Sequence, residues 1–100
     1  MAQLTIVFWR DIPAQVIVKA GNTTAKRQLD ARFQEAIDLA AMRARVHETD
    51  DYLAEWRRGK SEPCGDDCEA EAAKAQSRIE AEYDDDRLES LVADGGHDNG

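Results

Sequence analysis

Residues 4–19 of the chain read LTIVFWRDIPAQVIVK, two short apolar runs that are separated by a polar corner ending in proline. In residues 4–9 every side chain except that of Thr5 is apolar, and these residue types are typical of β-strands. Residues 15–18 repeat the pattern more weakly. The corner between the runs has turn chemistry, because Asp11 can bond to its own backbone and Pro13 has no N–H to give to a sheet. The stretch therefore predicts an N-terminal β-hairpin.

A β-hairpin on its own is only marginally stable in water, so other elements must cover it. From Asp30, a suitable N-cap, the apolar pattern takes on a helical period without Gly or Pro. We expect this helix, over residues 30–46, to pack on the hairpin, and Phe8 to belong to the core if it faces the helix. Turn formers at residues 21–24 end the second strand. A third strand, from residues 24–29 or from a partner, can extend the hairpin.

Two further helices are expected in the second half of the chain. Thr49 can cap a short second helix that carries Arg57 and Arg58 in its last turn. The third helix is capped by Asp66 or Asp67. Its apolar stripe is narrow and consists of Cys68, Ala72, Ala75, Ile79 and Tyr83.

The end of the chain is first acidic and then rich in glycine. Past the acidic run at residues 84–86, with or without a break, the apolar stripe resumes at Leu88, Leu91 and Val92. Residues 94–100 have little to bury, and we expect them to form a disordered tail. The predicted fold class is α+β, with an N-terminal β-hairpin packed against two or three helices. Residues 1–93 are expected to form a single domain that ends in an acidic C-terminal helix.

The formal charge of −8 is unevenly distributed. Residues 1–46 hold seven Lys or Arg and four Asp or Glu, whereas the remainder holds six and seventeen. An acidic chain repels phosphate, and the nearest approach to a basic patch is Lys26, Arg27 and Arg32, so we expect no nucleic-acid partner. The first three residues carry no charged side chain, and no segment approaches the ~20 apolar residues of a membrane span. We therefore expect a soluble, cytoplasmic protein that does not contact membranes.

Cys64 and Cys68 could be half of a zinc site, a redox pair or a disulfide. Zinc needs four ligands, and the other candidates of the usual kind are His47 and His97. The spacing of the cysteines differs from the Cys-x-x-Cys of redox motifs, and the surrounding acids raise thiol pKa values. We interpret them as two inert thiols, or as a bridge that forms only on oxidation. The acidic run at residues 84–86 lacks an EF-hand pattern, so we expect no metal and no other cofactor.

The corner at the hairpin contains residue types that are enriched at protein-binding hot spots, and a second Trp-Arg pair follows later in the chain. The candidate protein-binding residues are Trp9, Arg10, Asp11, Trp56 and Arg57. The alternative is that both tryptophans belong to the core and both arginines pair with neighbours. In that case Arg10 could pair with Glu55 or with the C-terminus of a helix.

Five stretches of the sequence resemble the bacterial virulence factor family, and Trp9-Arg10-Asp11-Ile12-Pro13 is the most specific part. The stretches are residues 5–18, 25–27, 33–38, 52–57 and 79–84. The resemblance runs from about residue 3 to about residue 93 and extends to the domain appended to larger conserved virulence factor proteins. It implies a compact domain of unestablished biochemical role, and it supplies no catalytic residues.

The sequence contains no nucleophile, acid and base in a pattern typical of catalysis. Our hypothesis is a small non-enzymatic protein-interaction or accessory domain with an unidentified protein partner. A homodimer through the hairpin edge is a further option. The alternative hypothesis is a small enzyme or cofactor accessory subunit whose site forms only at an interface with a partner.

Overall fold

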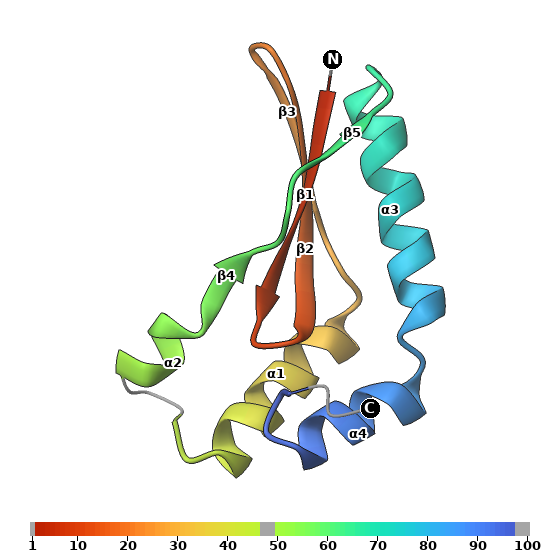
Figure 1. Cartoon of the computed structure of the whole chain (residues 1–100). Coiled ribbons are helices and arrows are strands. Elements are labelled where there is room, and N and C mark those ends of the chain that lie inside the picture. The colour runs from red at the N-terminus through yellow and green to blue at the C-terminus, as the bar shows by residue number, and fades with distance from the viewer. Residues whose placement is uncertain (1, 47–49, 98–100) are drawn as a thin grey trace.

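The computed structural model describes residues 2–46 and 50–97 and shows an antiparallel sheet with helices, as the sequence predicts (Figure 1). The strands are β1 (Ala2–Trp9), β2 (Ile12–Ala20), β3 (Thr23–Gln28), β4 (Trp56–Arg58) and β5 (Glu62–Cys64). β1 and β2 form the predicted hairpin, and β3 pairs with β2 as the expected third strand. Both β4 and β5 pair with the other edge of β1, so the sheet order is β3-β2-β1-β4. The α+β class is confirmed.

The helix that covers the sheet is not the one that the sequence favoured. The helices are α1 (Ala31–Arg43), α2 (Asp50–Ala54), α3 (Cys68–Glu82) and α4 (Asp85–Ala93). α3 lies along the sheet and contacts β2 and β3, whereas α1 contacts β2 at one end of the sheet and packs against α4 (Figure 1). Only Leu29 and Asp30 separate β3 from α1, so α1 begins at the end of the sheet, and there it packs on α4. Ala72 and Ala75 in the narrow stripe of α3 let that helix approach the strands closely.

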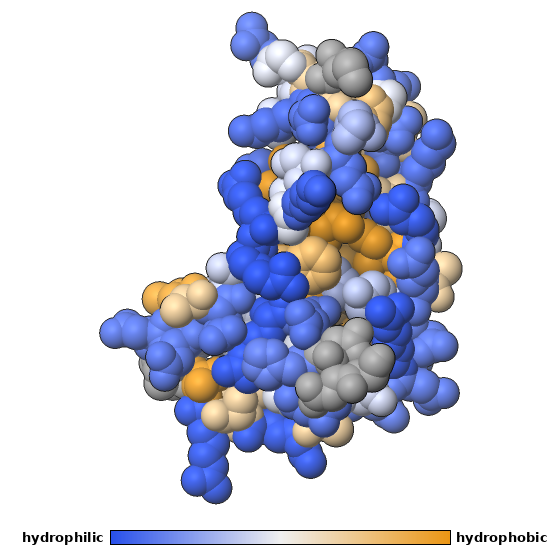
Figure 2. All heavy atoms as spheres, viewed as in Figure 1, coloured by the Kyte–Doolittle hydropathy of each residue, from blue (hydrophilic) through white to orange (hydrophobic). Residues whose placement is uncertain are grey.

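One part of the core lies between α3 and one face of the sheet, and another part consists of the buried residues of α1 and α4. The register places Leu4, Val18 and Ala25 side by side, and Ile6, Val16 and Arg27 form the next row on the same face. Val18 is fully buried, and Arg27 reaches Glu69 of α3 at 3.7 Å between the nitrogen and the carboxylate oxygen. Figure 2 shows apolar atoms in the hollow between the strands and α3, bordered by hydrophilic side chains.

Trp9, and not Phe8, occupies the core at the corner. The register between β1 and β2 shifts after Val7, so that Phe8 pairs with Pro13 and Ala14 is the extra residue of a β-bulge. Phe8 is only half-buried, and the guanidinium of Arg57 lies 4.7 Å from its ring centroid. The expectation that Phe8 belongs to the core is therefore wrong, because its ring packs under the exposed side chain of Arg57 and lies outside the buried cluster.

The second helix is shorter than predicted. α2 ends at Ala54, and residues 56–58 continue as β4, so Arg57 and Arg58 lie on a strand and not in the last turn of a helix. Pairing with β1 explains the change, since it satisfies backbone groups that a short helix would leave exposed. The expected cap at Thr49 and the candidate ligand His47 lie outside the described residues.

The third helix breaks at the acidic run. Asp67 caps α3 by accepting a hydrogen bond from the backbone N–H of Ala70. Asp84 then caps a separate helix, α4, and accepts from the backbone N–H of Arg87. Asp85 and Asp86 fill the first turn of α4, where carboxylates interact favourably with the helix dipole. The acidic run thus starts a helix in addition to carrying exposed charge.

Residues 94–97, which we expected to be part of a disordered tail, pack against the rest of the protein. The backbone N–H of Asp11 donates to the carbonyl of Gly96 at 2.8 Å, and the N–H of Gly96 donates to the carbonyl of Leu91 at 2.7 Å. Both Gly95 and Gly96 are buried. The rest of the expected tail, residues 98–100, lies outside the described residues.

Within residues 2–46 and 50–97, no helix is both long enough and apolar enough to span a membrane.

Candidate functional site

The structure brings the five predicted binding residues together at the corner. The register of β1 and β4 pairs Trp9 with Trp56 and Phe8 with Arg57, and the turn Arg10-Asp11 follows directly. Two residues far apart in the sequence, Glu55 and Gly95, also contact this turn. The corner is therefore the point where β1, β4 and the segment after α4 meet.

Trp9 is completely buried and cannot contact a partner without rearrangement. Its indole N–H donates to the backbone carbonyl of Tyr52 at 2.9 Å, and its ring lies 5.6 Å from the ring of Tyr52. A buried indole is stable where its N–H finds an acceptor of this kind. These contacts agree with the interpretation of Trp9 as a core residue.

Arg10 makes contacts inside the protein. The sequence left open whether Arg10 pairs internally or binds a partner. Its side chain is 13% exposed, its Nε lies 3.4 Å from a carboxylate oxygen of Glu55, and its Nη1 donates to the carbonyl of Gly95 at 2.7 Å. The guanidinium also lies 5.0 Å from the ring centroid of Trp9. Gly95 follows directly after the C-terminus of α4, so both expected partners, Glu55 and a helix C-terminus, are present.

Arg10 also has an unfavourable backbone conformation. A two-residue hairpin loop requires a positive φ at its first residue, where Gly or Asn is usual, and Arg10 has a φ of 54°. The strain costs roughly 1 kcal/mol, so the side-chain contacts of Arg10 must offset it.

We expect Arg10→Ala to lower the free energy of unfolding by about 1.5–3 kcal/mol, because it removes an ion pair and a hydrogen bond from a charged donor that is mostly buried. Arg10→Gly removes the same side chain but relieves the positive φ, so it should be about 1 kcal/mol less destabilising than Arg10→Ala. Urea denaturation of both variants measures the difference. A loss below about 0.5 kcal/mol for Arg10→Ala would contradict the structural role of the side chain.

The remaining candidates at the corner are more accessible. Arg57 donates to a carboxylate oxygen of Asp11 at 3.1 Å, and its Nε donates to the backbone carbonyl of Arg10 at the same distance. The side chains of Arg57 and Asp11 are 51% and 35% exposed, and Trp56 is half-buried. The accessible part of the predicted site is therefore Trp56, Arg57 and Asp11.

The sheet face opposite α3 has no helix along it among the described residues. It consists of three rows of paired residues, which we call the open face: Arg58, Val7, Gln15 and Gln28; Thr5, Ile17 and Lys26; Gln3, Lys19 and Thr24. Direct cross-strand partners lie on the same side of a sheet, which places these side chains together. Ile17 is buried among them although it is not part of the main core.

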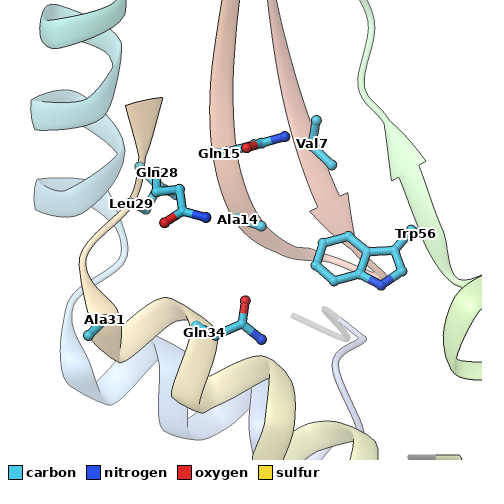
Figure 3. A pocket seen from close by; sticks show the side chains of 8 residues that line it. All are labelled: Val7, Ala14, Gln15, Gln28, Leu29, Ala31, Gln34 and Trp56. Carbon is cyan, nitrogen blue, oxygen red and sulfur yellow. The ribbon is translucent and has the colours of Figure 1, made fainter. Parts of the chain in front are cut away.

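A pocket of about 630 Å³ lies at the end of the open face next to α1 (Figure 3). Its lining consists of Val7, Ala14, Gln15, Gln28, Leu29, Ala31, Gln34 and Trp56. Gln28, Gln34 and Trp56 point into the space between the sheet and α1 (Figure 3). The corner and the pocket share Trp56, so the two regions form one continuous surface.

The pocket offers neutral hydrogen-bonding groups. Gln34 donates through its Nε2 to a carboxylate oxygen of Asp38 at 3.1 Å, which leaves its carbonyl oxygen as an acceptor. The side-chain amides of Gln15 and Gln28 form no hydrogen bond with any other described residue. A side-chain amide presents one acceptor and two donors, which match the groups of a peptide backbone. The sequence analysis missed these glutamines, although Gln15 follows the two-residue period of its strand.

The comparison with protein families decides the family of the chain. The model of the virulence factor family matches residues 7–92, which is most of the chain and includes the corner, the pocket and, except for the last residue of α4, the helices of the described residues. The chain belongs to the virulence factor family. No curated protein and no solved structure matches it. The family match confirms the resemblance of the sequence but assigns no reaction to this virulence factor domain.

The two cysteines of the virulence factor domain are free thiols. Cys64 lies on β5 and is half-buried, and Cys68 is buried in the core at the start of α3. Burial raises the pKa of the Cys64 thiol, and the nearby carboxylate of Glu71 raises it further. A raised pKa keeps the thiol protonated near neutral pH, which lowers its reactivity as a nucleophile. Among the described residues, no three acidic, His or Cys side chains cluster so that they could hold a metal ion.

Proposed function

We propose that this virulence factor domain is a non-enzymatic protein-interaction domain that binds an extended segment of a partner protein on the open face. The observation that carries the proposal is the pocket at the end of this face, with the indole of Trp56 and with the amides of Gln15 and Gln28, which have no hydrogen-bond partner among the described residues. Trp is enriched at binding hot spots, and amides can bond to the backbone of an extended segment. Trp56 remains in the proposed site, Arg57 and Asp11 border it at the corner, and Trp9 and Arg10 support it from inside.

The chemistry of the pocket favours binding over catalysis. Its eight lining residues include aliphatic, amide and indole side chains and no group that titrates near neutral pH. General acid–base catalysis needs a titratable group within hydrogen-bond reach of the reacting atoms. The alternative of a small enzyme or cofactor accessory therefore has no specific observation in its favour at this pocket. A cytoplasmic location is part of the proposal, since Cys64 and Cys68 are unpaired.

A homodimer through the hairpin edge would need a different strand. β3 pairs with one edge of the β1–β2 hairpin, and β4 and β5 pair with the other. The outer edge of β3 is the place where a second copy could add a strand, and Thr23, Thr24 and Lys26 are exposed there. We propose a different protein as the partner, and not a second copy of the chain, because the pocket lies on the open face and not on this edge.

Photo-cross-linking in cells tests the proposed site. A benzophenone amino acid is placed at Gln28, an exposed residue on the rim of the pocket, and in a second variant at Leu53, an exposed residue on α2. We expect ultraviolet light to give a discrete protein adduct with the probe at Gln28, because a bound segment lies within its reach. The position of the adduct on a denaturing gel and its mass spectrum identify the partner.

Leu53 is the matched control, since its side chain is 67% exposed and does not line the pocket. The same adduct at equal yield from both positions would indicate unspecific contact. The absence of any protein adduct from Gln28, with the variant folded and expressed at the level of the wild type, would contradict the proposed function.

A further inference from the structure

The open face has a charge opposite to that of the whole chain. Its three rows contain Lys19, Lys26 and Arg58 and no carboxylate, whereas the chain carries a formal charge of −8. Next to the pocket, the carboxylate of Asp38 accepts a hydrogen bond from Gln34, one of the lining residues. The open face is thus a local basic surface on an acidic protein.

These three cations have no ion-pair partner among the described residues. Lys19, Lys26 and Arg58 are all exposed, and none of them lies within ion-pair distance of a described carboxylate. Other arginines differ: Arg27 on the opposite face contacts Glu69, and Arg57 at the corner contacts Asp11. The charge of the open face is therefore available to a ligand.

The cations are spaced for an extended chain. Arg58 is on β4 and Lys26 is on β3, three strands away and one row along the face. With strands ~4.8 Å apart, the two positions are separated by roughly 15 Å, a distance that about five residues of extended polypeptide cover. Successive side chains on one side of such a segment repeat every ~6.6 Å, so two or three of them can reach the cations.

We propose that the occupant of the open face is an extended, acidic segment of a partner protein, whose carboxylates bind Lys19, Lys26 and Arg58 and whose neutral part enters the amide-lined pocket. This inference rests on the proposed function and names the chemistry of the partner. A single-stranded nucleic acid fits less well, because the centre of the face consists of Thr5 and Ile17, where sheets that bind single strands present aromatic rings for stacking.

Binding of labelled synthetic peptides to the purified full chain tests the inference. The probes are a peptide of about ten residues with alternating Glu and Thr, its counterpart with Gln in place of Glu, and a single-stranded DNA of equal charge, measured by fluorescence anisotropy at about 50 mM salt. We expect the acidic peptide to bind at least ~tenfold more tightly than the Gln peptide and than the DNA, since charge complementarity gives specificity.

Two double variants with the same change in net charge separate the open face from the general effect of charge. Lys19→Gln/Lys26→Gln should weaken binding of the acidic peptide about three- to tenfold and reduce its dependence on salt. Lys74→Gln/Arg78→Gln on the exposed side of α3 should leave binding within about twofold of the wild type, because these residues lie across the sheet from the open face.

Equal weakening by both double variants, tighter binding of the DNA, or equal binding of the two peptides would overturn the inference. Self-association of the chain that is lost in Lys19→Gln/Lys26→Gln, without binding of the acidic peptide, would also overturn it, because the occupant would then be a second copy. In each of these cases an adduct of the probe at Gln28 with a protein other than a second copy would leave the proposed function intact. The two failures are therefore distinguishable.

Discussion

Replacing Trp9 by alanine is expected to lower the free energy of unfolding by about 3–5 kcal/mol, a large share of the ~5–15 kcal/mol typical of a domain. The indole is completely buried, its ring packs on that of Tyr52, and Gly96 lies against its edge. Truncation to alanine leaves a cavity and removes the hydrogen bond to the carbonyl of Tyr52. The cost therefore combines lost burial, a cavity and an unsatisfied carbonyl.

Trp56→Ala is the matched control, because Trp56 is the direct cross-strand partner of Trp9 but is only half-buried and lines the pocket. We expect Trp56→Ala to lower the free energy of unfolding by about 1–2 kcal/mol, because folding buries less of the apolar surface of Trp56 than of Trp9. Guanidinium denaturation followed by circular dichroism measures both. Equal losses for the two variants would contradict the assignment of Trp9 to the core and Trp56 to a surface.

Gly96→Ala is expected to destabilise the protein by about 2–4 kcal/mol. Gly96 has a φ of 96°, and a Cβ at this position would lie 2.8 Å from a ring carbon of Trp9 and 3.2 Å from Cδ of Arg10. The strain of the backbone and the collision with a ring that is held by the core act together. Displacement of residues 94–97 would also break the hydrogen bond from the N–H of Asp11 and expose Trp9.

Gly21→Ala separates the two causes. Gly21 also has a positive φ, 59°, but a Cβ there would meet no atom within 4 Å. Its replacement should cost only the strain of the backbone, about 1 kcal/mol. Thermal unfolding of the two variants shows whether the collision matters. If Gly96→Ala is no more destabilising than Gly21→Ala, the segment after α4 does not pack on the corner.

The fold was predictable wherever the pattern was local. Alternating apolar residues identify β1 and β2, and the short polar corner identifies the hairpin. The sequence offered Asp66 or Asp67 as the N-cap of α3, and the structure has Asp67 there. Local propensity could not show that α3 rather than α1 covers the sheet, because both helices carry an apolar stripe and the contacts of α3 with β2 and β3 are distant in sequence.

The contacts of the corner could not be predicted because they are distant in sequence. Residues 94–97 look like a tail, since glycine-rich segments bury little surface of their own. Their stability comes from contacts with Trp9, Arg10 and Asp11, more than eighty residues away along the chain. The pocket likewise needs glutamines from two strands and a helix, and no spacing within one element indicates that Gln15, Gln28 and Gln34 meet.

The corner holds the fold, and we propose that the open face binds the partner. Two variants, Arg10→Ala and Gln15→Glu, separate these roles. For each variant we would measure the folding stability and the yield of the adduct with the cross-linker at Gln28. Gln15 has no hydrogen-bonding partner for its side-chain amide among the described residues, and Glu has almost the same shape, so Gln15→Glu should keep stability within about 1 kcal/mol while placing a negative charge on the open face.

We expect Arg10→Ala to unfold at a lower denaturant concentration than the wild type and still to give the adduct at a temperature where it is folded. Gln15→Glu should keep its stability and lose most of the adduct. The reverse result, with the adduct lost in folded Arg10→Ala and retained in Gln15→Glu, would place the binding surface at the corner and contradict binding on the open face.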